Sequence, residues 1–205
     1  FIGDKMNKEF SNIIVFCGKD IIFIKEKIKK ILEDLGYKLS NIENYNIRID
    51  IIQDNISKVI IISSDYFKFD NLAKDKSVIR KISKRLASDT MMVTSKKDIS
   101  IIEKYSFNKR TYDYMCFGNR EKLILLGYNE AYEKYMYREV WKNNFVGRNS
   151  IEDLDNILSQ LNTFFENYEI ILEILKLYGI KKEFATYNPN DKLSFDVQKE
   201  ILYFK

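Results

Sequence analysis

Three glutamates recur along one predicted helix at a spacing that places them on one side of it. Glu166, Glu169 and Glu173 are three and four residues apart, and Asp155 precedes them in the same helix. Residues at these steps lie one above another on a helix surface, so the carboxylates form an acidic stripe. Stacked like charges cost some stability, and such a stripe is suited to docking a basic partner. The alternative interpretation is a solvated helix face.

A second candidate surface is basic. Four cations stack at four-residue spacing on another predicted helix; they are Arg80, Lys81, Lys84 and Arg85. They belong to the segment 74–110, which holds 11 basic and 4 acidic residues. The aromatic residues near this segment are Tyr105, Phe107 and Tyr112. A basic face with aromatic neighbours favours binding of phosphates and stacking of bases, whereas the alternative is again a solvated surface.

The residue types that are missing exclude several kinds of enzyme. The chain has no histidine and two cysteines, Cys17 and Cys116. Ser-His-Asp and Cys-His catalysis, histidine-based zinc sites and four-thiolate zinc sites are therefore excluded. No paired acids occur at a diagnostic spacing, so we expect no catalytic residues, no metal and no cofactor. Both cysteines fall in predicted strands, which favours buried, reduced thiols.

Length and composition indicate a globular protein. A chain of 205 residues with 45% hydrophobic and 31% charged residues can bury one sizeable core. Its longest apolar runs are about four residues, against the ~18 that a membrane span requires. The opening residues Phe1 to Met6 do not resemble a secretory signal. We therefore expect a cytoplasmic protein that contacts no membrane.

Charge is divided unevenly along the chain, although the net charge is only +4. Phe1 to Gly118 holds 22 basic and 16 acidic residues, whereas Asn119 to Lys205 holds 12 basic and 14 acidic residues. The predicted helix 150–178 has six acidic residues and one basic residue. The first part of the chain is therefore basic and the second part acidic.

The elements that position these residues begin with a sheet. Val59 to Ile62 are four consecutive β-branched residues stopped by Ser63-Ser64-Asp65, which predicts a strand buried on both faces at the centre of the sheet. Further strands are predicted at 12–17, 47–51, 90–94, 105–107, 111–117 and 122–126, and amphipathic helices at 23–35 and 77–86. The order β-α-β-β-α-β through residue 94 predicts an α+β fold with a ferredoxin-like antiparallel or mixed sheet and helices on one face.

The pattern becomes helical from Asn129. One charged helix is interrupted around Gly147, and the helix 150–178 ends at Gly179. The tail has a turn at Pro189 between short possible strands. We therefore expect an α+β sheet domain at 1–128 and a helical C-terminal part at 129–205, packed together as one compact unit.

One stretch carries a resemblance to a known family. It comprises the strand before Ser63-Ser64-Asp65-Tyr66-Phe67, the helix Val78–Leu86, the strand Thr90–Thr94 and a hairpin that ends at Cys116-Phe117-Gly118-Asn119. This stretch, roughly 58–126, resembles the small immunity proteins of bacterial polymorphic toxin systems, including those of contact-dependent growth inhibition.

The resemblance implies a cytoplasmic, non-enzymatic protein that binds one cognate toxin, commonly a nuclease, and blocks its active site or substrate surface. Inhibitors of nucleases are often acidic, and the basic total charge departs from that pattern. The acidic helix with Asp155, Glu166, Glu169 and Glu173 would then supply the contact with a basic toxin. The alternative is a nucleic-acid-binding accessory protein that uses Arg80, Lys81, Lys84 and Arg85.

Overall fold

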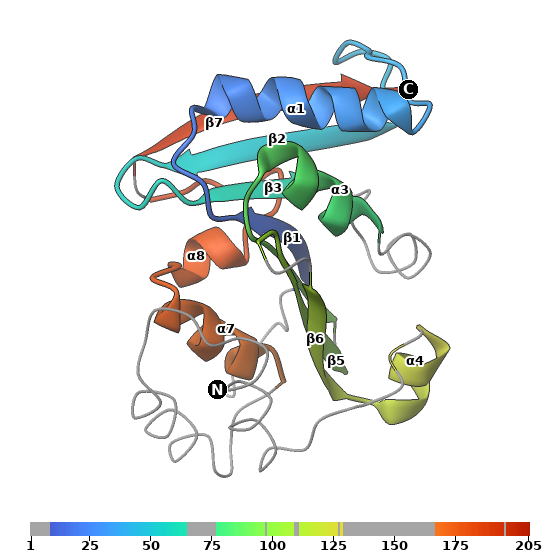
Figure 1. Ribbon diagram of the computed structural model, residues 1–205, viewed down its shortest axis with the longest axis vertical. Coiled ribbons are helices and arrows are strands. Elements are labelled where there is room, and N and C mark those ends of the chain that lie inside the picture. The colour runs from blue at the N-terminus through green and yellow to red at the C-terminus, as the bar shows by residue number, and fades with distance from the viewer. Residues whose placement is uncertain are drawn as a thin grey trace, which may run out of the picture.

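The structure is a computed structural model that describes residues 9–64, 77–96, 98–108, 111–126, 128, 167–194 and 196–205. Its helices are α1 (Ile21–Asp34), α3 (Ser77–Leu86), α4 (Arg120–Leu125), α7 (Asn167–Leu177) and α8 (Lys182–Ala185). Its strands are β1 (Phe10–Val15), β2 (Ile47–Asp54), β3 (Ile60–Ser64), β4 (Thr90–Lys96), β5 (Ile99–Ser106), β6 (Thr111–Gly118) and β7 (Val197–Phe204). The predicted α+β class is confirmed (Figure 1).

The described strands form one seven-stranded sheet in the order β6-β5-β4-β1-β3-β2-β7, and all neighbours are antiparallel. Every residue of β3 is buried, as its β-branched run predicted. The prediction that this strand is the centre of the sheet is wrong, because β1 occupies the middle position. A continuous apolar run indicates that both faces of the strand are covered, but it does not indicate where the strand lies in the order of the sheet. The sheet is twisted, since β2 and β7 run across the view in Figure 1 while β5 and β6 run down it.

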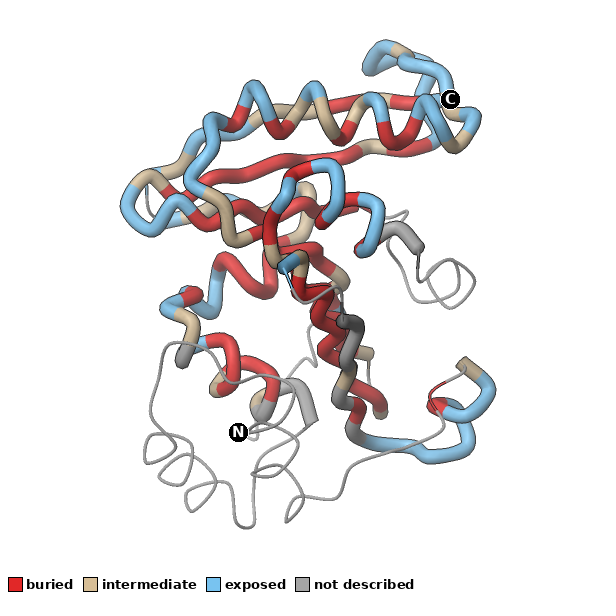
Figure 2. The backbone as a smooth tube through the Cα atoms, in the orientation of Figure 1, coloured by how far each residue is buried: buried red, intermediate tan, exposed pale blue. Residues whose placement is uncertain are grey.

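Helices α1 and α3 cover one face of the sheet. The side chain of Asp20 accepts a hydrogen bond of 2.7 Å from the backbone N–H of Ile22 and so caps the start of α1. The apolar side of α1 packs with strand residues in one core cluster that includes Ile24, Ile28, Ile82 and Leu86. In both helices the buried residues recur at three- and four-residue steps, as the apolar pattern of the sequence predicted (Figure 2).

Helices α7 and α8 cover the opposite face. Ile171, Leu175 and Phe184 join a second core cluster with Ile14, Ile61 and other residues that point to this side of the strands. The strands between the two helical layers are thus buried on both faces, which Figure 2 shows as mostly red along β1, β2 and β3. The core is a three-layer arrangement of helices, sheet and helices.

The predicted strand 122–126 is wrong, because these residues belong mainly to helix α4. The side chain of Asn119 accepts a hydrogen bond of 3.1 Å from the backbone N–H of Lys122 and caps the helix. Leu123 is buried while Leu125 is 86% exposed. Residues two positions apart lie on the same face of a strand, so this difference in burial does not fit a strand with one covered face. A short run of apolar residues does not distinguish a strand from a helical turn, and the cap decides here.

The C-terminal residues also enter the sheet. Strand β7 pairs with β2 over eight positions, from Ile47 opposite Phe204 to Asp54 opposite Val197. The predicted helical C-terminal part therefore includes an edge strand as well as α7 and α8. The predicted helix that begins at Asn129, and the predicted helix 150–178 up to residue 166, lie outside the described residues.

Candidate functional site

Helix α3 presents all four predicted cations to solvent. The exposed residues are Arg80, Lys81, Lys84 and Arg85. Ile79, Ile82 and Leu86 are buried on the other side of the helix. Because an amphipathic helix packs its apolar stripe on the sheet, its cationic residues must face outward. The structure therefore places together the residues that sequence spacing assigned to one basic face.

The cations of α3 border a groove against α1. The groove has a volume of about 410 Å³ and is lined by Ile31, Asp34, Lys81, Lys84 and Arg85. Three cations and one carboxylate give it a positive balance. Arg85 Nη2 makes an ion pair with Asp34 Oδ2, and both side chains are exposed, by 43% and 61%. An ion pair on the surface contributes about 0–1 kcal/mol to stability. The pair between Arg85 and Asp34 can therefore separate at little cost.

An exposed aromatic ring lies at the other end of α1. Phe23 is 38% exposed, and the Nζ atoms of Lys19 and Lys27 lie 4.7 and 5.0 Å from the centre of its ring. Lys19 Nζ also donates a hydrogen bond of 3.0 Å to the backbone carbonyl of Leu86 at the end of α3. Lys19 therefore connects the ring of Phe23 to the same pair of helices that forms the groove.

The basic segment 74–110 does not form a single surface. Lys104 is buried, and its Nζ lies 5.9 Å from the centre of the ring of Tyr178, the residue that follows α7 in the chain. Tyr105 is 2% exposed in the core cluster of α1 and α3, so the expectation that it stacks a base is wrong. The reason is that helices cover both faces of β5, and all eight of its residues are buried. Phe107 is half-buried, and the side chain of Tyr112 lies outside the described part.

The acidic candidates are only partly described. Glu166 and Asp155 lie outside the described residues, whereas Glu169 and Glu173 are half-buried on α7. Both line a hollow of about 580 Å³ between α7 and α8, together with Leu172, Lys176, Gly179, Ile180, Lys181, Lys182 and Glu183. Lys176 Nζ lies 3.3 Å from Glu173 Oε2. The described rim of this hollow therefore balances three carboxylates with three ammonium groups.

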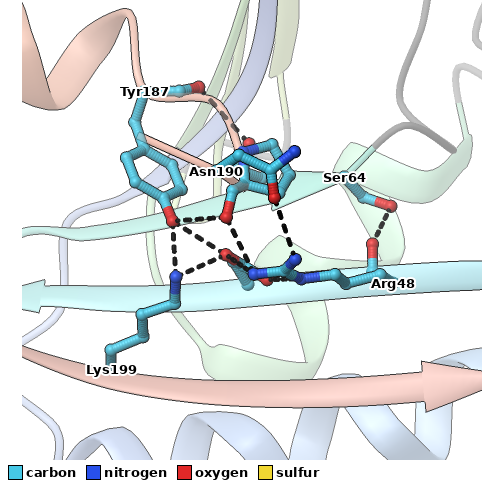
Figure 3. Close-up of polar contacts among 8 residues, drawn as sticks. Arg48, Ser64, Tyr187, Asn190 and Lys199 are labelled. Carbon is cyan, nitrogen blue, oxygen red and sulfur yellow. Dashed lines mark hydrogen bonds and ion pairs between the residues drawn. The ribbon is translucent and has the colours of Figure 1, made fainter. Parts of the chain in front are cut away.

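A polar cluster lies on the α7 and α8 side of the sheet, where the side chains of Arg48, Tyr187 and Lys199 point toward one another (Figure 3). They surround Asp50, which is fully buried. Arg48 Nε lies 2.7 Å from Asp50 Oδ1, and Arg48 Nη2 lies 3.0 Å from Oδ2, so the guanidinium binds the carboxylate with two hydrogen bonds. Lys199 Nζ lies 2.8 Å from the same Oδ2. Tyr187 also donates to Oδ2 over 2.8 Å, and accepts a hydrogen bond of 2.6 Å from Lys199 Nζ.

Two groups of this cluster have raised pKa values. Burial, followed by the hydrogen bond to Asp50, raises the pKa of the Tyr187 phenol well above its ordinary value. The hydrogen bond with Asp50 likewise raises the pKa of Arg48. Tyr187 therefore remains protonated and donates a hydrogen bond at neutral pH. It holds the segment before β7 against β2, and sequence reasoning missed this contact because the two residues are 137 positions apart.

Among the described residues, no group of three or more histidine, cysteine, aspartate or glutamate side chains is placed to hold a metal ion. No helix in the described ranges has both the length and the apolar character needed to cross a membrane.

Comparison with known proteins found no matching family model, no matching curated protein and no matching solved structure.

Proposed function

We propose that this protein is a non-enzymatic immunity protein that binds and neutralises a cognate bacterial toxin. The toxin has a basic surface, as a nuclease has, and the contact is made by the α7 and α8 side of the molecule. The protein acts in the cytoplasm without a cofactor.

The hollow between α7 and α8 is the observation that carries this proposal. Leu172 and Ile180 are buried residues that line it, and Glu169 and Glu173 stand on its rim. An apolar centre bordered by charged groups is the usual composition of a protein interface. Glu169 and Glu173 are also two members of the acidic stripe that the sequence indicates, and Glu166 and Asp155 extend it along the chain.

Charge reversal tests this surface. The variant Glu169→Lys with Glu173→Lys should weaken binding of the toxin by at least about tenfold, because each change places a cation against a basic partner. A matched control is Glu26→Lys with Glu33→Lys, which makes the same charge change at exposed positions on α1. Equal affinities of the two double variants would remove the α7 and α8 surface from the proposal.

We also assign the four inner strands to a ferredoxin-like arrangement. The order β4-β1-β3-β2 is antiparallel throughout. Helix α1 lies in the chain between β1 and β2, and α3 lies between β3 and β4. Both helices belong to one core cluster, which supports placing them on the same face. The strands β5, β6 and β7 extend this unit at its two edges.

Nucleic-acid binding is the second candidate function, and a separate observation favours it. Residues 19–34 and 77–86 together hold nine basic and four acidic residues, and the four cations of α3 are exposed. A cationic face of this kind releases counterions from phosphates, so its binding weakens steeply with added salt. In this candidate role the protein is an accessory protein that holds RNA or DNA on the α1 and α3 side.

A mobility-shift titration at low salt tests the second candidate. Arg80→Glu with Lys84→Glu should abolish the shift. Lys182→Glu with Lys192→Glu makes the same charge change at exposed positions distant in sequence from α3 and should retain most of it. Absence of any shift for the wild type at low salt would exclude this function.

A further inference from the structure

We propose that the groove between α1 and α3 binds a single strand of nucleic acid, with Phe23 as a stacking surface for a base and with Asp34 as an internal competitor for the phosphates. This inference rests on the second candidate function. It specifies which form of nucleic acid binds, and where.

One side of α1 carries the groove residues Ile31 and Asp34 together with Phe23 and Lys27, which do not line the groove. Phe23, Lys27, Ile31 and Asp34 follow one another at steps of four, four and three residues, so they lie along one side of the helix. Ile31 and Asp34 line the groove itself. Lys19 contacts both the Phe23 ring and the carbonyl of Leu86, so this side of α1 is the one next to α3.

The other wall supplies cations for a phosphate backbone. Lys81 and Lys84 line the groove and, within the part of the chain that the structure describes, form no ion pair. Arg85 is held by Asp34 instead. A backbone phosphodiester offers the arginine the same paired oxygens and the same single negative charge as a carboxylate, so it can replace Asp34. The Asp34 carboxylate thus occupies the position of a bound phosphate.

Phe23 decides between a single strand and a duplex. Its ring is 38% exposed, and the Nζ atoms of Lys19 and Lys27 lie over the ring. Proteins that bind single strands combine a cationic groove with aromatic rings on which unpaired bases stack. The bases of a duplex are already stacked on one another, so an exposed ring would add little affinity for a duplex.

The test measures fluorescence anisotropy at low salt, with a labelled oligothymidylate of about 12 nucleotides, within the usual range of site sizes. Asp34→Asn should tighten binding about threefold or more, because it frees Arg85 and removes a repulsive charge. Glu33→Gln is the matched control, since it removes the same charge from the exposed neighbouring position outside the groove. It should change the affinity by less than about twofold.

A second pair of variants tests the stacking surface. Phe23→Leu should weaken binding of the single strand about fivefold or more, and should leave the affinity for a duplex of the same length unchanged. Ile22→Ala removes apolar surface from the adjacent position, which is 53% exposed, and should have little effect on either probe.

The possible failures can be told apart. Equal effects of Asp34→Asn and Glu33→Gln would show that the groove is not the site. Equal affinities for single strand and duplex, with no effect of Phe23→Leu, would overturn the single-strand inference and leave nucleic-acid binding by α3 in place. No binding of either probe by the wild type would overturn both.

Discussion

The phenol of Tyr187 donates a hydrogen bond of 2.8 Å to Oδ2 of Asp50, and so joins the segment before the last strand to β2. Asp50 also accepts a hydrogen bond from Arg48 and forms an ion pair with Lys199. All three partners of Asp50 lie on the side of the sheet that α7 and α8 cover. Nearby, Asn12 Nδ2 donates to the backbone carbonyls of Ala185 and Tyr187 over 2.7 and 2.9 Å. These bonds fasten the α8 and β7 segment to the sheet.

Removal of the Tyr187 hydroxyl should lower the free energy of unfolding. Tyr187→Phe keeps the buried ring and deletes both the hydrogen bond to the Asp50 carboxylate and the one accepted from Lys199, so we expect a loss of about 2 kcal/mol in a urea titration. Tyr45→Phe is the control, because Tyr45 is 40% exposed and packs against the Tyr203 ring at 4.8 Å. It should change stability by less than about 0.5 kcal/mol. Equal losses would mean that the bond to Asp50 contributes nothing particular.

Neutralisation of Asp50 should have a larger effect. Asp50→Asn leaves Arg48 and Lys199 beside a buried amide, and the expected loss is about 3 kcal/mol. This value is at the lower end for a broken buried pair, because the Arg48 and Lys199 side chains are 24% and 33% exposed. Asp34→Asn breaks a surface pair and should cost less than about 1 kcal/mol. Denaturation curves that coincide for the two variants would contradict this account of Asp50.

Asp54 should contribute to acid sensitivity. Burial acts to raise its pKa, but hydrogen bonds from the Ile56 backbone N–H and the Ser57 hydroxyl, with the charge of Lys181, lower it overall. A lowered folded pKa means that the unfolded chain takes up the proton first as the pH falls. The stabilisation is therefore present above the unfolded value of about 3.9 and is lost as the pH falls through the folded value.

Asp54→Asn tests this effect, because the amide can still accept hydrogen bonds but does not titrate. The variant should be about 1 kcal/mol less stable than the wild type at pH 7. Its free energy of unfolding should also fall less between pH 5 and about pH 3. Parallel stability curves over this range would show that the Asp54 carboxylate is not responsible.

The elements that were predicted correctly are those whose pattern lies within a few neighbouring residues of the sequence. Helix α1 and helix α3 follow from apolar residues at three- and four-residue steps, and β3 follows from its β-branched run. The predicted strand 122–126 failed because its apolar run fits a helical turn as well, and only the Asn119 cap separates the two. The position of β7 beside β2 depends on contacts between residues about 150 positions apart, which no local pattern reports.

The candidate sites divide in the same way. Four-residue spacing identified the exposed cations of α3, because one helix carries them all. It did not identify Asp34 or Phe23, which belong to another helix and reach the basic surface only when α1 packs beside α3. The sequence contains one local indication of the Asp50 cluster. It is the alternation of apolar and charged residues that places Arg48 and Asp50 on the same face of β2. Tyr187 and Lys199 lie too far away in sequence to be found from it.

The most direct test of the proposed function is co-expression of this chain with the polypeptide encoded immediately upstream in its genome, followed by measurement of growth and then of co-purification. The immunity proposal predicts that the neighbour alone is toxic, that this chain restores growth, and that the two proteins purify as a stable complex. A harmless neighbour, or a toxic one that is neither neutralised nor bound, would contradict it.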